Sequence, residues 1–169
     1  MDAITAIKTR KSIRKFTGEV ITEEKLKIVL EAAFSAPTAN DFQSWEFIVV
    51  RDKEKLRKIA DLHPYAKMFP EAGCGIIVCG NKDKQELLGF LAEDCAAAIE
   101  NILIAANSEG LGAVWCGIYP MDKIVKEFEN EFDLPVNIVP IGIVAIGNPG
   151  EKKDVVDRFD SEKIHYDRW

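Results

Sequence analysis

The stretch Arg10-Lys11-Ser12-Ile13-Arg14-Lys15-Phe16 is the part of the sequence that says most about fold and function. Arg10, Ser12 and Arg14 alternate, so in an extended chain their side chains point to the same side. Two guanidinium groups and a hydroxyl can then donate hydrogen bonds to one anion, and arginine suits the geometry of a phosphate. Taken alone, the pattern also fits a solvated basic turn after a helix.

This basic stretch stands in an acidic chain. The 169 residues include 22 Lys and Arg and 28 Asp and Glu, for a net charge of −6. Residues 2–16 carry five cations and one acid, so they sum to +4 and the rest of the chain to −10. Because an acidic protein repels polyanions at long range, we expect no binding of nucleic acid or membrane by bulk charge. A local basic cluster can still hold one small anion.

Length and cysteine usage indicate one domain in a reducing compartment. The N-terminus has no apolar leader segment, and the apolar runs are shorter than a membrane span requires. We therefore expect a cytoplasmic protein, although an even number of cysteines also fits a secreted one. The cysteines lack metal-binding spacing and are expected to be buried thiols: Cys74, Cys79, Cys95 and Cys116.

Hydrophobic periodicity and capping residues predict helices that alternate with strands. Asp2, Thr22, Asp52 and Asp122 are expected to cap four of the helices. The predicted strands are Trp45–Val50, Ile76–Cys79, Ala113–Tyr119 and Ile138–Gly147, and the longest helix is expected from about Lys84 to Glu109.

Three of these elements carry further expectations. The uniformly apolar strand Ile76–Cys79 is expected to be covered on both faces. The long helix, with Leu88 on its buried side and Gly110 as its left-handed terminator, is apolar over much of its circumference. Such a helix is central or meets a second chain. Pro140 is expected to place the start of the last strand at an edge or entry point.

The composition changes after residue 150. Residues 151–169 are mostly charged, with apolar side chains spaced among the charges. Tyr166 and Trp169 would be costly to leave in water. We therefore divide the chain into one domain, 1–150, and a C-terminal arm, 151–169, that lies over a partner subunit.

Two further segments carry candidate binding groups. The polar loop Ser35–Trp45 offers Asn40 and Gln43, whose amides both donate and accept and so suit a planar heterocycle. In the segment Gly110–Pro120, Gly117 allows another group to approach the backbone closely. Taken alone, the loop also fits turn and capping material, and the glycine also fits a bulge.

Several other kinds of site are disfavoured. The glycines form neither a dinucleotide-binding fingerprint nor a phosphate-binding P-loop. His63 and His165 have no partners for a hydrolase triad or a zinc site, and both are expected to be ordinary polar residues. We expect no catalytic side chain and no metal.

Taken together, the order and spacing of these segments resemble the FMN-dependent nitroreductase family over nearly the whole chain. The resemblance rests on the R-x-S-x-R-x-F opening, on residues 36–45 where the family has A-P-S-x-x-N-x-Q-P-W, on residues 110–120, and on the ending from Arg158-Phe159 through Ile164–Trp169. It implies an α+β sandwich whose mixed, mainly antiparallel sheet is flanked by helices. It also implies a homodimer with two FMN sites at the interface and a C-terminal arm that crosses to the partner.

The resemblance also implies roles for individual residues. Arg10, Lys11, Ser12 and Arg158 look like contacts to the FMN phosphate. Arg14 looks placed against the flavin pyrimidine edge, where it would stabilise negative charge on reduction.

Two segments are similar to those that surround the flavin ring. Pro37, Thr38 and Asn40 resemble residues that reach the flavin of the other subunit, and Gln43 is assigned to the same site. The remaining residues, which resemble the strand beside the ring with a backbone N–H directed at flavin N5, are Trp115, Cys116 and Gly117.

The sequence departs from the family pattern at three positions. Thr38 stands where the family often has Ser, which is conservative, and Ser44 stands where it often has Pro, which is expected to loosen the turn. Val156 stands where many relatives carry a second basic residue, and Lys152 or Lys153 could supply that charge instead.

The expected function is that of an NAD(P)H-dependent FMN oxidoreductase that reduces nitroaromatics, quinones or similar electron-poor acceptors by a ping-pong cycle. The cofactor carries this chemistry, so no nucleophilic side chain is needed. Two alternatives stay open. The short segment His63–Glu71 leaves little material for a substrate lid, which favours an FMN storage, sensor or delivery module. A specialised flavin reductase or dehalogenase is the other, although that segment shows no motif for it.

Overall fold

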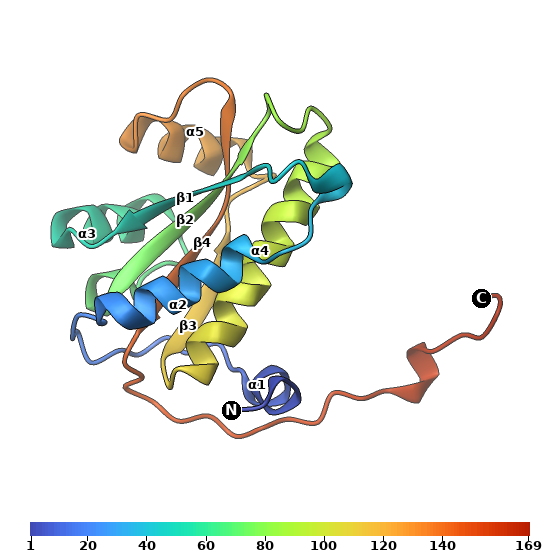
Figure 1. The fold of residues 1–169 in the computed structure, drawn as a ribbon. Coiled ribbons are helices and arrows are strands. Elements are labelled where there is room, and N and C mark those ends of the chain that lie inside the picture. Colours follow the sequence, from blue (N-terminus) through green and yellow to red (C-terminus); the bar gives the residue numbers. More distant parts are fainter.

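Helices and strands alternate along residues 1–169, which the computed structural model describes in full (Figure 1). The main elements are α1 Ala3–Thr9, α2 Glu23–Phe34, β1 Trp45–Val50, α3 Lys53–Leu62, β2 Cys74–Asn81, α4 Leu88–Ser108, β3 Gly112–Gly117, α5 Asp122–Glu131 and β4 Ile138–Gly147. Three short 3₁₀ turns lie between them, at Ala39–Asp41, Phe69–Glu71 and Ser161–Lys163.

The strands form one four-stranded sheet in the order β1-β2-β4-β3. Every neighbouring pair is antiparallel, and a parallel contribution comes from an isolated bridge between Ser12 and Ala113. Helices cover both faces, so the predicted α+β sandwich with a mainly antiparallel sheet is confirmed.

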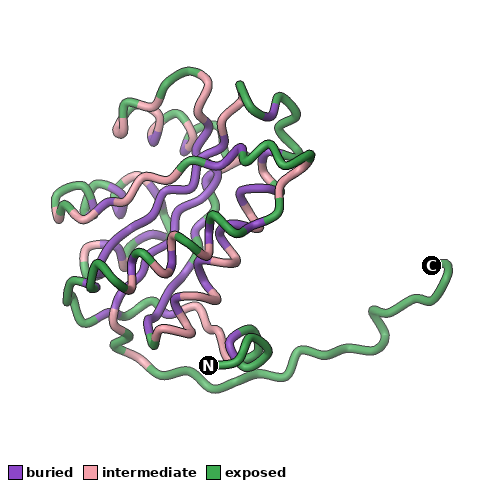
Figure 2. Tube along the Cα trace, viewed as in Figure 1, coloured by how far each residue is buried: buried purple, intermediate pink, exposed green.

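Two apolar cores lie on opposite faces of the sheet, and β2 contributes to both because successive strand residues point to opposite sides. Ile76 and Val78 join the core formed with α2 and α4, whereas Ile77 and Cys79 join the core formed with α3 and α5. All four side chains are fully buried, as expected for a strand covered on both faces. Figure 2 shows the strands at the centre of the fold in the colour of buried residues.

The helix α4 is the central helix of its layer. It contacts all four strands as well as α1 and α2, which confirms the prediction that this apolar helix is central. Gly110 follows it with a φ of 72°, the expected left-handed terminator. Neither α4 nor any other helix combines the length and the apolar character needed to cross a membrane.

Three of the four predicted helix caps are confirmed. Asp2, Thr22 and Asp52 each accept a hydrogen bond from the backbone N–H three residues later, at 3.0, 3.3 and 2.8 Å. The predicted cap at Asp122 is wrong, because Asp122 is already the first residue of α5 and makes no cap hydrogen bond.

The start of α4 also differs from the prediction. It begins at Leu88 rather than near Lys84, because the amides of Lys84 and Gln85 turn back onto the carbonyl of Asn81. As the first residue of the helix, Leu88 is 40% exposed and not buried as predicted.

Pro140 lies near the start of the central strand β4, where β4 pairs with β2 alone because the ladder with β3 reaches only to Gly142. This end of the strand is open on one side, as expected from the sequence. Pro140 stands opposite Cys79, where the register of β2 against β4 shifts between Val78 and Cys79. An open side and a ladder irregularity of this kind both tolerate a residue without an N–H.

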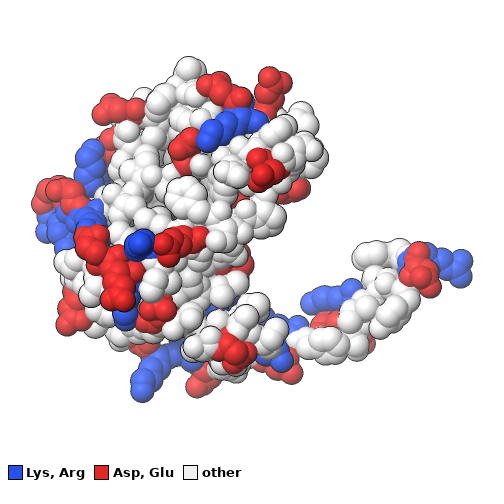
Figure 3. Space-filling model, viewed as in Figure 1, with Lys and Arg blue, Asp and Glu red and all other residues white.

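The chain leaves the body after Gly150 as an extended arm (Figure 1). Residues 152–169 are exposed, including Phe159, Tyr166 and Trp169 at 78, 82 and 99%. Figure 3 shows charges of both signs near the end of the arm, which stands away from the body. An arm of this composition has no core of its own.

Candidate functional site

The basic stretch 10–16 runs alongside β3, an edge strand of the sheet. Ser12 forms a parallel bridge with Ala113, and the amide of Ile13 donates to the carbonyl of Ala113 at 3.0 Å. Ile13 and Phe16 are buried, whereas Arg14 is exposed. The stretch is therefore extended, as predicted, with its apolar residues inward and its cations available to a ligand.

A hollow of about 660 Å³ collects these cations, and we call it the cationic hollow. It is lined by Arg10, Lys11, Ser12, Arg14, Lys152, Lys153, Asp154, Val156 and Arg158. Its one acidic residue is Asp154, so positive charge dominates. Cations that meet a hydroxyl around one hollow form a suitable donor set for a phosphate.

Two lysines supply positive charge to the cationic hollow, where Val156 carries none. Lys152 and Lys153 both line the cationic hollow, and Lys153 Nζ donates to the carbonyl of Ser12 at 2.7 Å. The contact ties the start of the arm to the basic stretch. The alternative source of charge considered from the sequence is therefore present at the hollow.

Two acids hold parts of the basic stretch in place. Glu151 accepts a hydrogen bond from the Arg14 amide at 2.6 Å and pairs with Lys153 at 3.4 Å. The Arg14 amide, followed by Lys153, holds the pKa of Glu151 below its ordinary value. Arg10 forms an ion pair of 3.3 Å with Glu100 of α4. These pairs orient the cations from outside the hollow's lining.

A second hollow of about 530 Å³ adjoins the first through Arg14, which lines both. We call it the aromatic hollow. Its lining joins the end of β3 to the segment after α3 and consists of Arg14, His63, Tyr65, Lys67, Met68, Trp115, Cys116, Gly117 and Met121. Flat aromatic and flexible thioether side chains of this kind suit a planar ring.

His63 fixes the end of β3 and is not the ordinary loop residue that was expected. It is 1% exposed, and its Nε2 donates to the carbonyl of Gly117 at 2.7 Å. Its Nδ1 accepts from the amide of Tyr65 at 3.2 Å, so the ring is the neutral tautomer protonated at Nε2. His165, by contrast, lies exposed in the arm and stacks on Trp169.

The loop that carries Pro37, Thr38, Asn40 and Gln43 lines neither hollow. Asn40, Asp41 and Gln43 have φ values of 53°, 55° and 49°, so three of its residues are left-handed. Within the loop, Thr38 Oγ1 accepts from the Gln43 amide at 3.0 Å. The predicted site residues thus form two sets: eight at the hollows, and four in a loop elsewhere on the same chain.

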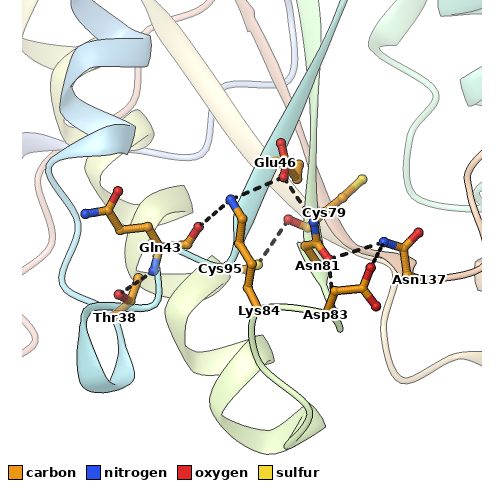
Figure 4. A network of polar contacts seen from close by, with 9 residues as sticks. All are labelled: Thr38, Gln43, Glu46, Cys79, Asn81, Asp83, Lys84, Cys95 and Asn137. Carbon is orange, nitrogen blue, oxygen red and sulfur yellow. Dashed lines mark hydrogen bonds and ion pairs between the residues drawn. The ribbon is translucent and has the colours of Figure 1, made fainter.

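The ends of this loop are held from outside it. A buried carboxylate, that of Asp94 on α4, accepts from the Ala39 amide and from Ser44 Oγ, both at 2.8 Å. Lys84 Nζ lies 3.3 Å from the Gln43 carbonyl (Figure 4). Ser44, which stands where the family often has proline, is fully buried.

A network of polar contacts continues beyond Lys84 (Figure 4). Lys84 Nζ pairs with Glu46 at 3.5 Å, and the Asn81 amide group donates to the same carboxylate at 3.3 Å. Asn137 Nδ2 then contacts Asn81 Oδ1 and Asp83 Oδ2, at 3.4 and 2.6 Å. The Gln43 end of the loop is therefore linked to β1, β2 and the start of β4.

The model of the nitroreductase family matches residues 7–67 and 62–148 of the chain. The chain belongs to the nitroreductase family. A protein of Methanothermobacter thermautotrophicus, provisionally named NADH dehydrogenase/NAD(P)H nitroreductase, is 42% identical over all of this chain and 88% of its own length. The FMN reductase [NAD(P)H] of Bacillus subtilis is 25% identical over 98% of this chain and 73% of its own length.

Solved structures support the same fold. A crystal structure from Parabacteroides distasonis, with the same provisional name, has a TM-score of 0.95 and 34% identity over 99% of this chain and 98% of its own. The FMN-dependent nitroreductase of Clostridium difficile has a TM-score of 0.91 and 28% identity, over 98 and 99%. The predicted family and fold are confirmed, and the chain is an oxidoreductase of the nitroreductase type.

The cysteines of this nitroreductase-family chain are free, buried thiols, as expected from the sequence. Burial raises the pKa of Cys74 and of Cys79 to about 12. Cys116, in the aromatic hollow, also has a raised pKa because of burial, partly opposed by Arg14, and its Sγ donates to the Tyr65 carbonyl at 3.3 Å. Burial therefore favours the thiol form of Cys116 over the thiolate, which is the nucleophilic form.

Proposed function

We propose that the protein is an FMN-dependent oxidoreductase that uses NAD(P)H. The observation that carries the proposal is the pair of adjoining hollows, one cationic and one aromatic, joined at Arg14. FMN has an anionic phosphate and a planar ring, so its two ends match the two linings. Relatives named FMN reductase and FMN-dependent nitroreductase support the same cofactor.

The lining of the cationic hollow supports a phosphate site there. Arg10, Lys11, Ser12 and Arg158 would donate hydrogen bonds to the phosphate oxygens, and the Arg guanidiniums can do so in bidentate fashion. The nearby Lys152 and Lys153 would add charge where Val156 supplies none.

The end of β3 would form the seat of the ring. A Cβ at Gly117 would meet no protein atom within 4 Å, so the missing side chain leaves space beside the strand. Trp115, Cys116 and Gly117 would lie along the ring with a backbone N–H toward it, while His63 fixes the strand by its bond to the Gly117 carbonyl. Arg14 would place its positive charge at the pyrimidine edge, where negative charge develops on reduction.

We propose further that two copies of the chain form a homodimer in the cytoplasm, with domain 1–150 of each covered by arm 151–169 of the other. The loop with Pro37, Thr38, Asn40 and Gln43 lies outside the hollows of its own chain, which supports a role at the flavin of the partner. The exposed apolar side chains of the arm support its docking on another surface.

When bound, FMN would accept a hydride from NAD(P)H and pass electrons in a second half-reaction to a nitroaromatic, quinone or similar electron-poor acceptor. The residues described here would bind and orient the cofactor and its reactants and would supply no nucleophile. This division of work is usual for cofactor enzymes.

An absorption spectrum of the freshly purified protein tests the proposal. We expect flavin bands that bleach on anaerobic addition of NADH or NADPH and return with menadione. Turnover of menadione well above that of free FMN is expected for an oxidoreductase. A yellow protein that neither nicotinamide bleaches would overturn the proposal and favour an FMN storage or sensor module.

A further inference from the structure

We propose that Asp94 and Ser44 are positioning residues for flavin binding, because they hold the loop 37–43 in a preset, strained conformation. The inference rests on the proposed function, in which this loop reaches the partner's flavin. Neither residue lines a hollow, so both would act through the loop and not by contact with the cofactor.

The loop needs an external restraint. Asn40, Asp41 and Gln43 all have left-handed backbone conformations, which are unfavourable for residues with a side chain. Asn and Asp tolerate this region better than Gln does. Such a conformation persists when the surrounding contacts over-determine it.

Asp94 supplies that restraint at both ends of the loop. One carboxylate oxygen accepts from the Ala39 amide, ahead of the left-handed residues, and the other accepts from Ser44 Oγ, just after them. The side chain comes from the second turn of α4, the helix that contacts all four strands. The position of the loop is thereby tied to the central helix of its layer.

The charge of Asp94 makes these two hydrogen bonds obligatory. The residue is 5% exposed, and no lysine, arginine or histidine forms an ion pair with it. The hydrogen bonds from the Ala39 amide and the Ser44 hydroxyl compensate the negative charge of the carboxylate. A loop conformation that removed these donors would leave a buried carboxylate without partners, which is strongly unfavourable.

Substitution of Asp94 tests the inference, with Cys95→Ala as the matched control. Cys95 is the next residue of α4, is fully buried, and donates through Sγ to the Cys79 carbonyl and not to the loop. The measurements are the thermal midpoint, hydrogen–deuterium exchange of residues 36–45, and the FMN dissociation constant of the dimer.

For Asp94→Ala we expect exchange in residues 36–45 and the FMN dissociation constant to rise at least about tenfold. Asp94→Asn should stay within about threefold of wild type, because the amide can accept from Ala39 and donate to Ser44 Oγ. Cys95→Ala should lower the midpoint without changing either loop measurement. If Asp94→Ala does not fold, Ser44→Ala should give the same changes at about a third of their size.

Asp94→Ala with exchange and FMN affinity within about twofold of wild type would overturn the inference, as would Cys95→Ala weakening FMN equally. These results differ from failure of the proposed function, which would appear as a wild-type protein that binds no FMN at all.

Discussion

At the scale of single residues, substitution of Gly117 tests the proposed cofactor site without disturbing the fold. A methyl group there would meet no protein atom within 4 Å, whereas one at Gly142, on the neighbouring strand, would lie 2.4 Å from Trp115 Nε1. We expect Gly117→Ala to change the free energy of unfolding by less than about 0.5 kcal/mol and to weaken FMN about tenfold. Gly142→Ala should cost about 1–3 kcal/mol through overpacking. Urea unfolding and FMN titration give both quantities, and undiminished FMN affinity in Gly117→Ala would remove Gly117 from the ring seat.

The role of a site residue could be predicted from the sequence where the residues that act together lie in one short motif. The alternation in residues 10–16 correctly predicts an extended basic stretch, and the structure gathers its cations with Arg158 at one hollow. His63 and Asp94 could not be found in this way, because their partners, the Gly117 carbonyl and the Ala39 amide, are 54 and 55 residues distant. A buried polar residue becomes significant only when tertiary structure shows what it touches.

At the scale of elements, local signals predicted three of the four helix caps correctly, whereas features that depend on distant contacts could not be predicted. Asp2, Thr22 and Asp52 cap their helices because the donor lies three residues away, within the reach of a sequence pattern. The place of β4 between β2 and β3 could not be predicted, because strand order depends on pairing between distant segments. The start of α4 was misplaced for a similar reason, since contacts with Asn81 hold Lys84 outside the helix.

Glu151 joins the basic stretch to the start of the arm, and this junction should depend on pH. The hydrogen bond from the Arg14 amide, followed by Lys153, lowers its pKa below the ordinary 4.5. A lowered folded-state pKa stabilises the junction above about pH 4.5, and the contribution is lost as the pH falls through the folded value. We expect the thermal midpoint of Glu151→Gln to fall less steeply than wild type below that pH. Glu162→Gln, in the exposed arm, should follow wild type, and parallel curves for Glu151→Gln and wild type would contradict the prediction.

At the scale of the whole molecule, the residues of the proposed flavin site lie in two separate places on the chain. Eight of the proposed residues surround the two hollows, but the loop with Asn40 and Gln43 lies elsewhere. The arm also exposes Phe159, Tyr166 and Trp169, and burial of each such side chain stabilises by about 1.5–3 kcal/mol. Both features have one explanation if a second copy supplies the missing loop and receives the arm.

Removal of the arm should therefore abolish dimerisation and FMN binding together. Deletion of residues 155–169 keeps Glu151 and Lys153 in contact with the basic stretch but removes the apolar side chains and Arg158. We expect it to yield a monomer with little bound FMN.

Arg158→Ala should stay dimeric and bind FMN about tenfold more weakly, since hydrogen bonds to charged groups contribute about 1.5–3 kcal/mol. Arg168 lines neither hollow, so Arg168→Ala should match wild type in mass and in FMN affinity. Light scattering after size exclusion gives the mass, and a truncated protein that remains a flavin-loaded dimer would show that the arm serves neither purpose.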